Sequence, residues 1–261
     1  MMIREKKTLA ERASYPSLAG KRVVVSGGAS GIGEGIVEGF VSQGAAVVFV
    51  DVQKKESEAL IERLSNAKVP QRFNHCDITD IDGYIGELGS IVDELGGCDV
   101  LINNAASDDR HSMCEVTPKY WDDRMAVNLK HQFFAAQTVA PAMKSAGGGS
   151  IVNLGSISWH LGLRDLALYQ TAKAAIEGMT RSMARELGRD NIRVNTILPG
   201  NVQTPRQMRW YSPEGEAEIV EAQCLDGRIQ PADIAAMALF LASDDARFCT
   251  AHNYWVDAGW R

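Results

Sequence analysis

Three side chains in the middle of the chain have the types and the spacing needed to move a proton. Tyr169 and Lys173 lie four residues apart in a stretch whose apolar spacing predicts a helix, and Ser156 ends a strand-like run thirteen residues before Tyr169. Residues at i and i+4 share one helix face, so the Lys173 ammonium would favour the ionised phenol and lower the pKa of Tyr169 from about 10. A phenolate near neutral pH can act as a base toward an alcohol. The tetrapeptide alone also fits an ordinary solvated pair on a helix surface.

A glycine-rich turn near the amino terminus lies between a strand and a helix. Arg22 to Ser26 form a β-branched run, the glycines Gly27, Gly28, Gly31 and Gly33 follow, and residues 34–43 have helical character. Glycines in such a turn allow a close approach to a pyrophosphate, and the free N–H groups at the start of the helix attract the anion. This arrangement predicts a dinucleotide site.

An acidic residue ends the second predicted strand, where a ribose-binding group is expected. Val47 to Val50 form that strand, and Asp51 follows eighteen positions after Gly33. A carboxylate there would accept hydrogen bonds from the ribose hydroxyls and repel a 2′-phosphate, and Ser30 places no cation nearby. The sequence therefore favours NAD over NADP, although Lys54 and Lys55 are close along the chain on a helix that begins near Gln53.

Five motifs together resemble the short-chain dehydrogenase/reductase family, from about Gly20 to the carboxyl terminus. They are the glycine turn, the run Asn103-Asn104-Ala105-Ala106, Asn128, Ser156 and the Tyr169/Lys173 pair, in the family's order and at its approximate spacings. Two positions depart from the common pattern, because Ser26 replaces the usual threonine and Ala106 replaces the usual glycine.

The resemblance implies four catalytic residues. Tyr169 would be the general base, Lys173 would lower its pKa and bind the nicotinamide ribose, and Ser156 would bind the reacting oxygen. Asn128 would stabilise a local helix irregularity and hold a water that links Lys173 to solvent. Read without the resemblance, Ser156 could equally cap the segment that follows it.

The resemblance also implies a set of residues that contact NAD. Asp77 would touch the adenine, Asn103 to Ala105 would form the floor beneath the cofactor, and Thr204 would bind the carboxamide. Asn103 and Asn104 could also simply end a strand, and Pro199-Gly200 is an ordinary turn signal. The expected cofactor-binding residues are Gly27, Ser30, Gly31, Ile32, Gly33, Asp51, Asp77, Ile78, Asn104, Ala105, Tyr169, Lys173, Pro199, Gly200, Val202 and Thr204.

Strand and helix signals alternate along the chain, which predicts a single α/β domain. Strand candidates lie near residues 22, 46, 70, 98, 150, 192 and 253, so we expect a Rossmann-like, doubly wound parallel sheet of about seven strands with helices on both faces. The chain of 261 residues is long enough for a sizeable core. Residues 1–19 are expected to form a partly mobile extension, and residues 20–261 the catalytic domain.

Composition limits the classes of partner. A formal charge of −6 without a basic block argues against nucleic acid. No apolar run approaches the roughly 20 residues that a membrane helix needs, and the charged start does not resemble a signal peptide. The five cysteines show no C-x-x-C pair or disulfide spacing, and the scattered His and Cys suggest no metal site. These features predict a cytoplasmic protein with reduced thiols.

Substrate choice should come from three less regular segments, Asp108 to His111, Ser158 to Leu161 and Arg206 to Tyr211. Their polar groups and aromatic rings suit a polyhydroxylated molecule better than a steroid or an acyl chain. Alternatively, they are solvated loops whose tryptophans pack at an interface. The candidate substrate contacts are Ser156, Ser158, His160, Tyr169, Gln170, Asn201, Arg206 and Trp210.

Within the family, the segments Gly155–Leu163, Trp210–Gly215 and Tyr254–Arg261 resemble the bacterial pentose 1-dehydrogenases. That resemblance implies NAD-dependent oxidation of an anomeric hydroxyl to an aldonolactone, with D-xylose as the expected substrate. L-arabinose and a 2-keto-3-deoxy sugar acid remain alternatives, the latter because Arg110 or Arg206 could bind a carboxylate.

Two further expectations follow from the family likeness. A regulator that binds NAD without chemistry would have no need for the complete Asn128, Ser156, Tyr169 and Lys173 set, so an enzyme is the favoured interpretation. Family members usually form homotetramers through two long helices, here expected over residues 118–144 and 167–188, and through the last strand near Tyr254. The terminal Trp255, Trp260 and Arg261 could serve that interface or reach a neighbouring site.

Overall fold

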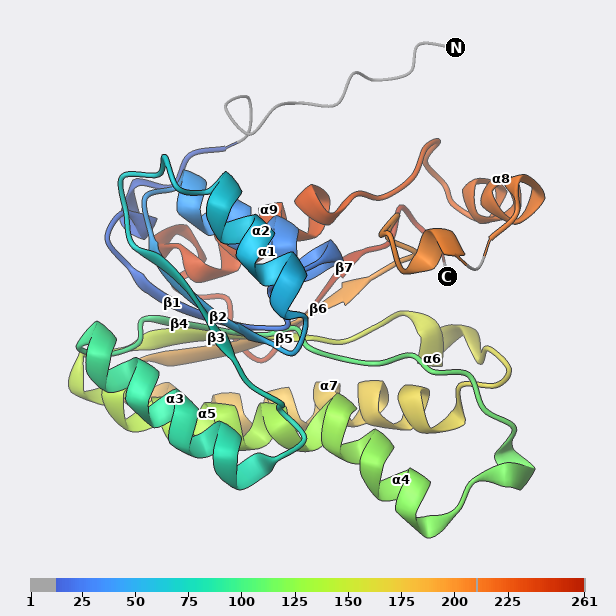
Figure 1. Cartoon of the computed structure of the whole chain (residues 1–261), viewed down its shortest axis with the longest axis horizontal. Coiled ribbons are helices and arrows are strands. Elements are labelled where there is room, and N and C mark those ends of the chain that lie inside the picture. Colours follow the sequence, from blue (N-terminus) through green and yellow to red (C-terminus); the bar gives the residue numbers. More distant parts are fainter. Residues whose placement is uncertain (1–12, 210, 261) are drawn as a thin grey trace.

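A seven-stranded parallel sheet with helices on both faces forms the molecule, as the sequence predicts (Figure 1). The computed structural model describes residues 13–209 and 211–260. The strand order is β3-β2-β1-β4-β5-β6-β7, and every neighbouring pair is parallel. The strands are β1 Arg22–Ser26, β2 Ala46–Asp51, β3 Gln71–His75, β4 Val100–Asn103, β5 Gly149–Leu154, β6 Ile192–Pro199 and β7 Asn253–Val256.

Alternate residues of the central strands enter two separate core layers. In β1, Val23 and Val25 pack with one layer, whereas Val24 packs with the other, and all three are fully buried. A strand that is covered on both faces needs apolar residues at successive positions, which explains the uninterrupted valine run. Figure 1 shows α1, α2 and α9 on one face and α3, α5 and α7 on the other.

The helices differ from the sequence expectation mainly where they begin. They are α1 Gly31–Ser42, α2 Lys54–Arg63, α3 Ile81–Leu95, α4 Pro118–Met125, α5 His131–Ser145, α6 Ser158–Leu161, α7 Ala167–Leu187, α8 Pro213–Glu221 and α9 Pro231–Ala242. Helix α1 begins three residues before the expected start at Glu34, so two of the glycines of the turn, Gly31 and Gly33, belong to its first turn. Short 3-10 helices cover Pro16–Leu18, Met113–Glu115, Gly188–Asp190, Gln207–Arg209 and Asp244–Ala246.

The first of the two expected long helices is interrupted. A π-helical turn over Ala126–Lys130 separates α4 from α5, and the buried Asn128 lies within it. The side chain of Asn128 accepts a hydrogen bond from the Ser107 N–H (2.9 Å) and donates to the carbonyl oxygens of Ser107 (3.0 Å) and Arg124 (3.1 Å). The irregularity thus ties the helix to the loop that follows β4.

Some residues before position 20, the expected start of the catalytic domain, pack against that domain. Leu18 is fully buried in the core layer beneath α1 and α9, and the Tyr15 N–H donates to Gln43 Oε1 at 2.7 Å. Residues 1–12, on which most of the expected extension falls, lie outside the described part of the chain. None of the helices in the described part has the length and apolar character to cross a bilayer.

The sheet order reverses direction between β1 and β4. From β1 the chain builds outward to β2 and β3, and it then returns to add β4 to β7 on the other side. Crossover connections therefore diverge at the carboxyl ends of β1 and β4, where open α/β sheets bind ligands. The fold predicts a cavity at this edge.

Candidate active site

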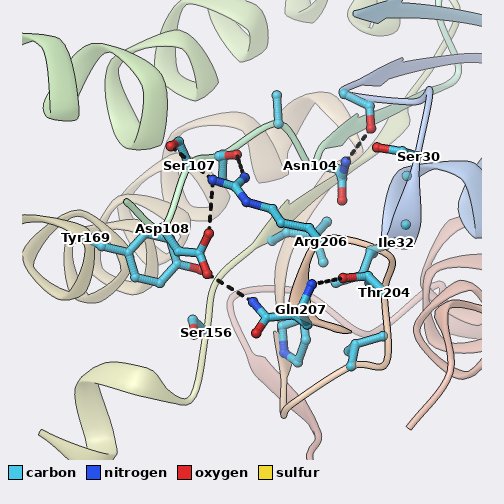
Figure 2. Close-up of a pocket in the computed structure, with 18 of the residues that line it drawn as sticks. Ser30, Ile32, Asn104, Ser107, Asp108, Ser156, Tyr169, Thr204, Arg206 and Gln207 are labelled. Atoms are coloured by element: carbon cyan, nitrogen blue, oxygen red, sulfur yellow. Dashed lines mark hydrogen bonds and ion pairs between the residues drawn. The ribbon is translucent and has the colours of Figure 1, made fainter. Parts of the chain in front are cut away.

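A cavity of about 1190 Å³ opens at the carboxyl ends of the strands, where the sheet order reverses. Residues from the loops after β1, β2, β4, β5 and β6 line it, together with the first turns of α7. All sixteen residues that the sequence predicts to contact the cofactor are among those lining residues. They extend along the sequence from Gly27 to Thr204, and Figure 2 labels Ser30, Ile32, Asn104, Tyr169 and Thr204 among them.

The glycine turn has no room for side chains. Gly27 has a φ of +70°, and a Cβ on it would lie 2.8 Å from the Ala105 Cα. A Cβ on Gly33 would lie 1.8 Å from the carbonyl oxygen of Gly27. The turn therefore brings its backbone close to the start of α1, where the Ser30 side chain makes no capping hydrogen bond within the described structure. Uncapped N–H groups at a helix start suit a diphosphate.

Hydrogen bonds from the loop after β4 hold the glycine turn in position. Asn104 donates from its side-chain nitrogen to the carbonyl oxygens of Gly27 (2.7 Å) and Ser26 (3.1 Å). The Ser26 hydroxyl in turn accepts hydrogen bonds from the N–H groups of Asn104 and Ala105. The hydroxyl is what this contact requires, so serine replaces the usual threonine without loss of the bond.

Asp51 is buried at the end of β2 and faces the cavity. One carboxylate oxygen accepts a hydrogen bond from the Ala29 N–H, and the other accepts one from the Gln53 N–H, each at 2.9 Å. These bonds fix the carboxylate beside the glycine turn. Lys54 and Lys55 are exposed and do not line the cavity, so α2 directs them to solvent.

Ser156, Tyr169 and Lys173 all line the same cavity, Ser156 from the loop after β5 and the other two from α7. Figure 2 labels Ser156 and Tyr169. Ser158 orients the serine, because its N–H donates to Ser156 Oγ at 3.1 Å and its hydroxyl accepts from Ser156 Oγ at 3.0 Å. Lys173 is fully buried and donates from Nζ to the Leu154 carbonyl oxygen at 2.6 Å. As the strand and helix signals predict, Ser156 follows a strand, and Tyr169 and Lys173 lie on one helix.

The expected lowering of the Tyr169 pKa is wrong. Burial, and after it the negative charge of Asp108, raise the pKa of Tyr169 to about 12, although Ser156 and Arg206 act in the opposite direction. Burial also lowers the pKa of Lys173 to about 7. The Lys173 ammonium points to Leu154 and lies 5.5 Å from the centre of the tyrosine ring, so desolvation outweighs its attraction for the phenolate.

Known proteins share this chain's sequence and fold over nearly its whole length. The family model described as Enoyl-(Acyl carrier protein) reductase matches residues 27–261. The D-xylose 1-dehydrogenase of Caulobacter vibrioides is 57% identical, with 95% of this chain and 99% of the relative covered. This chain belongs to the short-chain dehydrogenase/reductase family.

Two other relatives show how widely this family's substrates vary. The probable galactose dehydrogenase GalD of Rhizobium meliloti is 43% identical over 95% of this chain and 97% of its own length. A 7α-hydroxysteroid dehydrogenase, solved with NADH and 7-oxo glycochenodeoxycholic acid, superposes with a TM-score of 0.90 at 29% identity, covering 94% of this chain and 96% of that one. The fold alone therefore does not determine which substrate a protein of this kind acts on.

Two of the expected substrate contacts of this short-chain dehydrogenase do not line the cavity. His160 lies 3.2 Å from Glu177 Oε1 and stacks against the rings of Trp159 and Trp255. Gln170 lies on the turn of α7 beside Tyr169 but donates to the Leu163 carbonyl oxygen at 2.7 Å. Both expectations are corrected, because these side chains bind other parts of the protein.

The remaining expected substrate residues have mixed placements. Ser158, Asn201 and Arg206 line the cavity, in addition to Ser156 and Tyr169. Asn201 is held by Tyr211, to whose hydroxyl it donates at 3.0 Å, and by Arg228, from which it accepts at 2.7 Å. Trp210 and Arg261 lie outside the described residues. Trp260 lines the cavity of its own chain.

Three lining residues of the mouth were not among the individual candidates. Ser107, Asp108 and Gln207 face the cavity and join the loop after β4 to the segment after β6. Asp108 belongs to a segment that the sequence singled out for its polarity, but no spacing rule marked it within that segment. A contact between positions 99 residues apart leaves no local signal.

Within the described ranges, no three His, Cys, Asp or Glu side chains gather as they would around a metal ion. Separately, the hydroxyl of Ser156, the phenol of Tyr169 and the amine of Lys173 are groups that can transfer a proton and bind an oxyanion.

Proposed function

We propose that this protein oxidises the anomeric hydroxyl of a neutral aldopyranose, D-xylose first of all, with NAD as hydride acceptor and an aldonolactone as product. The observation that carries the proposal is the 57% identity to the D-xylose 1-dehydrogenase of Caulobacter vibrioides over 95% of the chain. The placement of Ser156, Tyr169 and Lys173 around one cavity supports it independently. The relative acting on galactose is consistent with a sugar as the class of substrate.

The proposed oxidation removes a proton from the anomeric hydroxyl and a hydride from the anomeric carbon. The bound NAD supplies the acceptor for the hydride from the anomeric carbon. Tyr169, as phenolate, takes the proton of the anomeric hydroxyl, and Ser156 donates a hydrogen bond to the oxygen as the carbonyl of the lactone forms. Lys173 holds a positive charge beneath the phenol and passes the proton on, and Asn128 positions the loop through Ser107.

A neutral sugar fits the electrostatics of the mouth better than a sugar acid does. Arg206 forms ion pairs with Asp108 (3.1 Å) and Asp109 (3.3 Å), so two carboxylates already neutralise it. The other expected carboxylate partner, Arg110, donates to the Arg164 carbonyl oxygen. A substrate carboxylate placed at Arg206 would therefore lie beside the carboxylates of Asp108 and Asp109 and would be repelled by them.

The charge around the adenosine end supports NAD as the cofactor. Asp51, Glu34 and Glu56 line that part of the cavity. The one lining cation nearby, as far as the described residues show, is Arg63, which is already paired with Glu34 and Glu38. A 2′-phosphate would therefore face an excess of negative charge.

An Asp51→Asn variant should accept NADP better than the wild type does. The substitution keeps the size of the side chain but removes the charge that would repel a 2′-phosphate, and it weakens the acceptor for the ribose hydroxyls. We expect the ratio of kcat/KM for NADP to that for NAD to rise about 10- to 100-fold. Steady-state kinetics with both cofactors measure the ratio, and a thermal melt checks that the Ala29 contact survives. An unchanged ratio would contradict the role of Asp51.

Steady-state NADH production over a substrate panel tests the proposed reaction. The panel contains D-xylose, L-arabinose, D-galactose, D-glucose and a 2-keto-3-deoxy sugar acid. We expect kcat/KM to be highest for D-xylose, with related aldoses within about 10- to 200-fold, as expected when single pocket contacts differ. Activity confined to the acid would refute the aldose assignment, and NADH binding without any turnover would favour a regulator.

We also infer a cytoplasmic homotetramer from the family. Helices α4, α5 and α7 lie together on one side of the molecule (Figure 1), and α4 and α5 expose the rings of Trp121 and Phe133. Large exposed apolar side chains on neighbouring helices suit a contact between subunits. Light scattering of the purified protein would give the number of subunits.

A further inference from the structure

The mouth of the cavity is closed on one side by a network between two loops (Figure 2). Arg206 and Gln207, which follow β6, both reach Asp108, which follows β4. Arg206 also donates to the Ser107 hydroxyl at 3.3 Å and to the Ala106 carbonyl oxygen at 3.4 Å. These contacts fix the position of Asp108 relative to the loop that carries the expected nicotinamide contacts.

Each oxygen of the Asp108 carboxylate has one donor from the second loop. Oδ2 accepts a hydrogen bond from Gln207 Nε2 at 2.9 Å, and Oδ1 lies 3.1 Å from Arg206 Nη2. A carboxylate can accept about four hydrogen bonds in all. Within the described residues, each oxygen of this cavity-lining carboxylate thus has one donor and retains capacity to accept further hydrogen bonds.

Asp108 lies close to the reacting groups. Its charge acts on both Tyr169 and Lys173 and raises the pKa of each. Its side chain is 23% exposed and lines the cavity. A fixed carboxylate beside the base, aimed into a cavity that takes a polyol, is placed to accept hydrogen bonds from hydroxyls next to the one that reacts.

We propose that Asp108 determines substrate specificity by accepting hydrogen bonds from the sugar hydroxyls at C2 or C3, near the anomeric centre, with Arg206 and Gln207 as its positioning residues. This inference rests on the proposed sugar dehydrogenase function. It goes further by assigning discrimination between hydroxylated and deoxygenated substrates to one side chain. In this proposal Arg206 positions Asp108 and does not bind a substrate carboxylate.

Asp109 provides a matched control. It also pairs with Arg206, at 3.3 Å, and it accepts a hydrogen bond from Arg124 at 2.6 Å. Its side chain is 55% exposed, however, and it does not line the cavity. Asp108→Asn and Asp109→Asn therefore each remove one negative charge from Arg206, but only the first changes an acceptor that faces the substrate.

The test compares D-xylose with its 2-deoxy and 3-deoxy analogues in the wild type, Asp108→Asn and Asp109→Asn. In the wild type we expect at least one deoxy analogue to lose about 10- to 100-fold in kcat/KM, the worth of a hydrogen bond to a charged group. Asp108→Asn should lose a similar factor on D-xylose, chiefly through KM, and should no longer distinguish D-xylose from that analogue. Asp109→Asn should retain both the activity and the discrimination within about threefold.

Two readouts separate recognition from other roles of Asp108. Fluorescence titration with NADH should give equal affinities for all three proteins, which shows that the cofactor site is intact. If Asp108→Asn lowers kcat/KM by one factor on every substrate, or if its only effect is a pH profile displaced toward lower pH, the carboxylate acts on Tyr169 alone and the inference is overturned. Equal effects of the two variants would also overturn it.

Failure of the proposed function would look different. If wild-type enzyme does not oxidise D-xylose or another aldose, the reaction assignment fails before any variant is compared. If the wild type oxidises an aldose but its Asp108→Asn variant keeps full discrimination, the reaction stands and only the role of Asp108 is rejected.

Discussion

A Tyr169→Phe variant should lose about 10²- to 10⁴-fold in kcat, the contribution that a positioned acid–base group makes to proton transfer. The phenyl ring keeps the packing at the start of α7, and the substitution removes only the phenol hydroxyl and its hydrogen bond with Ser156. NADH affinity should therefore remain within about threefold, because the glycine turn and Asp51 are untouched. Single-turnover kinetics and fluorescence titration with NADH would measure the two quantities separately.

A second tyrosine serves as the control for that variant. Tyr15 packs against the core layer that contains residues of α1 and α9, and it does not line the cavity. Tyr15→Phe should retain activity within about twofold. A Tyr169→Phe enzyme that turns over as fast as the wild type would remove the base from the mechanism and with it the proposed function.

The raised pKa of Tyr169 also fixes the direction of the pH dependence. Because a base must be deprotonated, and because burial and the charge of Asp108 raise the pKa of this phenol to about 12, kcat/KM for oxidation should increase as the pH rises through the neutral and alkaline range. The residual activity of Tyr169→Phe should lack this increase. The positive charge of the oxidised nicotinamide favours a nearby phenolate, so we expect kcat to depend on pH at lower values than kcat/KM does.

Local patterns were sufficient to predict the fold and the cofactor side of the cavity. The glycine turn, Asp51 and the strand ends are each recognisable within about ten residues, and parallel strands bring their carboxyl ends to one edge of the sheet. A correct strand order is therefore enough to bring the expected cofactor-binding residues, from Gly27 to Thr204, to one cavity. Their contacts with NAD remain predictions.

The substrate side could not be predicted in the same way. His160 does not line the cavity, because its ring packs against the ring of Trp255. Trp255 lies on β7, far from His160 along the chain. The ring of Trp159 and the carboxylate of Glu177 complete that arrangement. Likewise, the charge that acts on Tyr169 comes from Asp108, whose position is set by Gln207 after β6. Such contacts depend on how loops from different strands pack, which the spacing of residues along one segment does not encode.

The sign of the Tyr169 pKa shift shows the same limit for electrostatics. The i, i+4 spacing correctly brings Lys173 near the phenol, but it does not show how deeply the two groups are buried. In the structure, desolvation is the largest cause of both shifts, and it acts against the charged form of each group. At a solvent-exposed surface, a Tyr/Lys pair with this spacing would stabilise the charged form of each side chain. Here, burial destabilises the phenolate of Tyr169 and the ammonium of Lys173.

That burial leads to an expected conflict between stability and activity at Lys173. A Lys173→Met variant should be inactive, because it lacks the ammonium beneath Tyr169, yet it should be more stable than the wild type near neutral pH. In the unfolded chain the amine keeps its proton up to about pH 10.5, whereas burial lowers its pKa in the folded protein to about 7. The folded state therefore carries the full cost of the buried charge below about pH 7, and this cost disappears as the pH rises toward about 10.5.

The expected gain is the balance of two effects. Removing the buried charge stabilises the folded state at pH 6.5 by roughly 3 to 5 kcal/mol at most. Methionine has a similar length and is apolar, but it leaves the Leu154 carbonyl oxygen without its 2.6 Å donor, which costs about 1 to 3 kcal/mol. The net stabilisation should thus lie between about 0 and 4 kcal/mol at pH 6.5, and it should shrink as the pH is raised.

Urea unfolding at pH 6.5, 8 and 9.5, at one fixed protein concentration, would measure this trend. Lys119→Met is the matched control, because Lys119 is 84% exposed on α4 and its ion pair with Asp123 should contribute less than about 1 kcal/mol at any of these pH values. A Lys173→Met protein that is less stable than the wild type at every pH would show that the amine is neutral and well bonded in the fold. A gain that fades between pH 7 and 10 would mean that the fold tolerates a destabilising charge at the position where proton transfer to Tyr169 requires one.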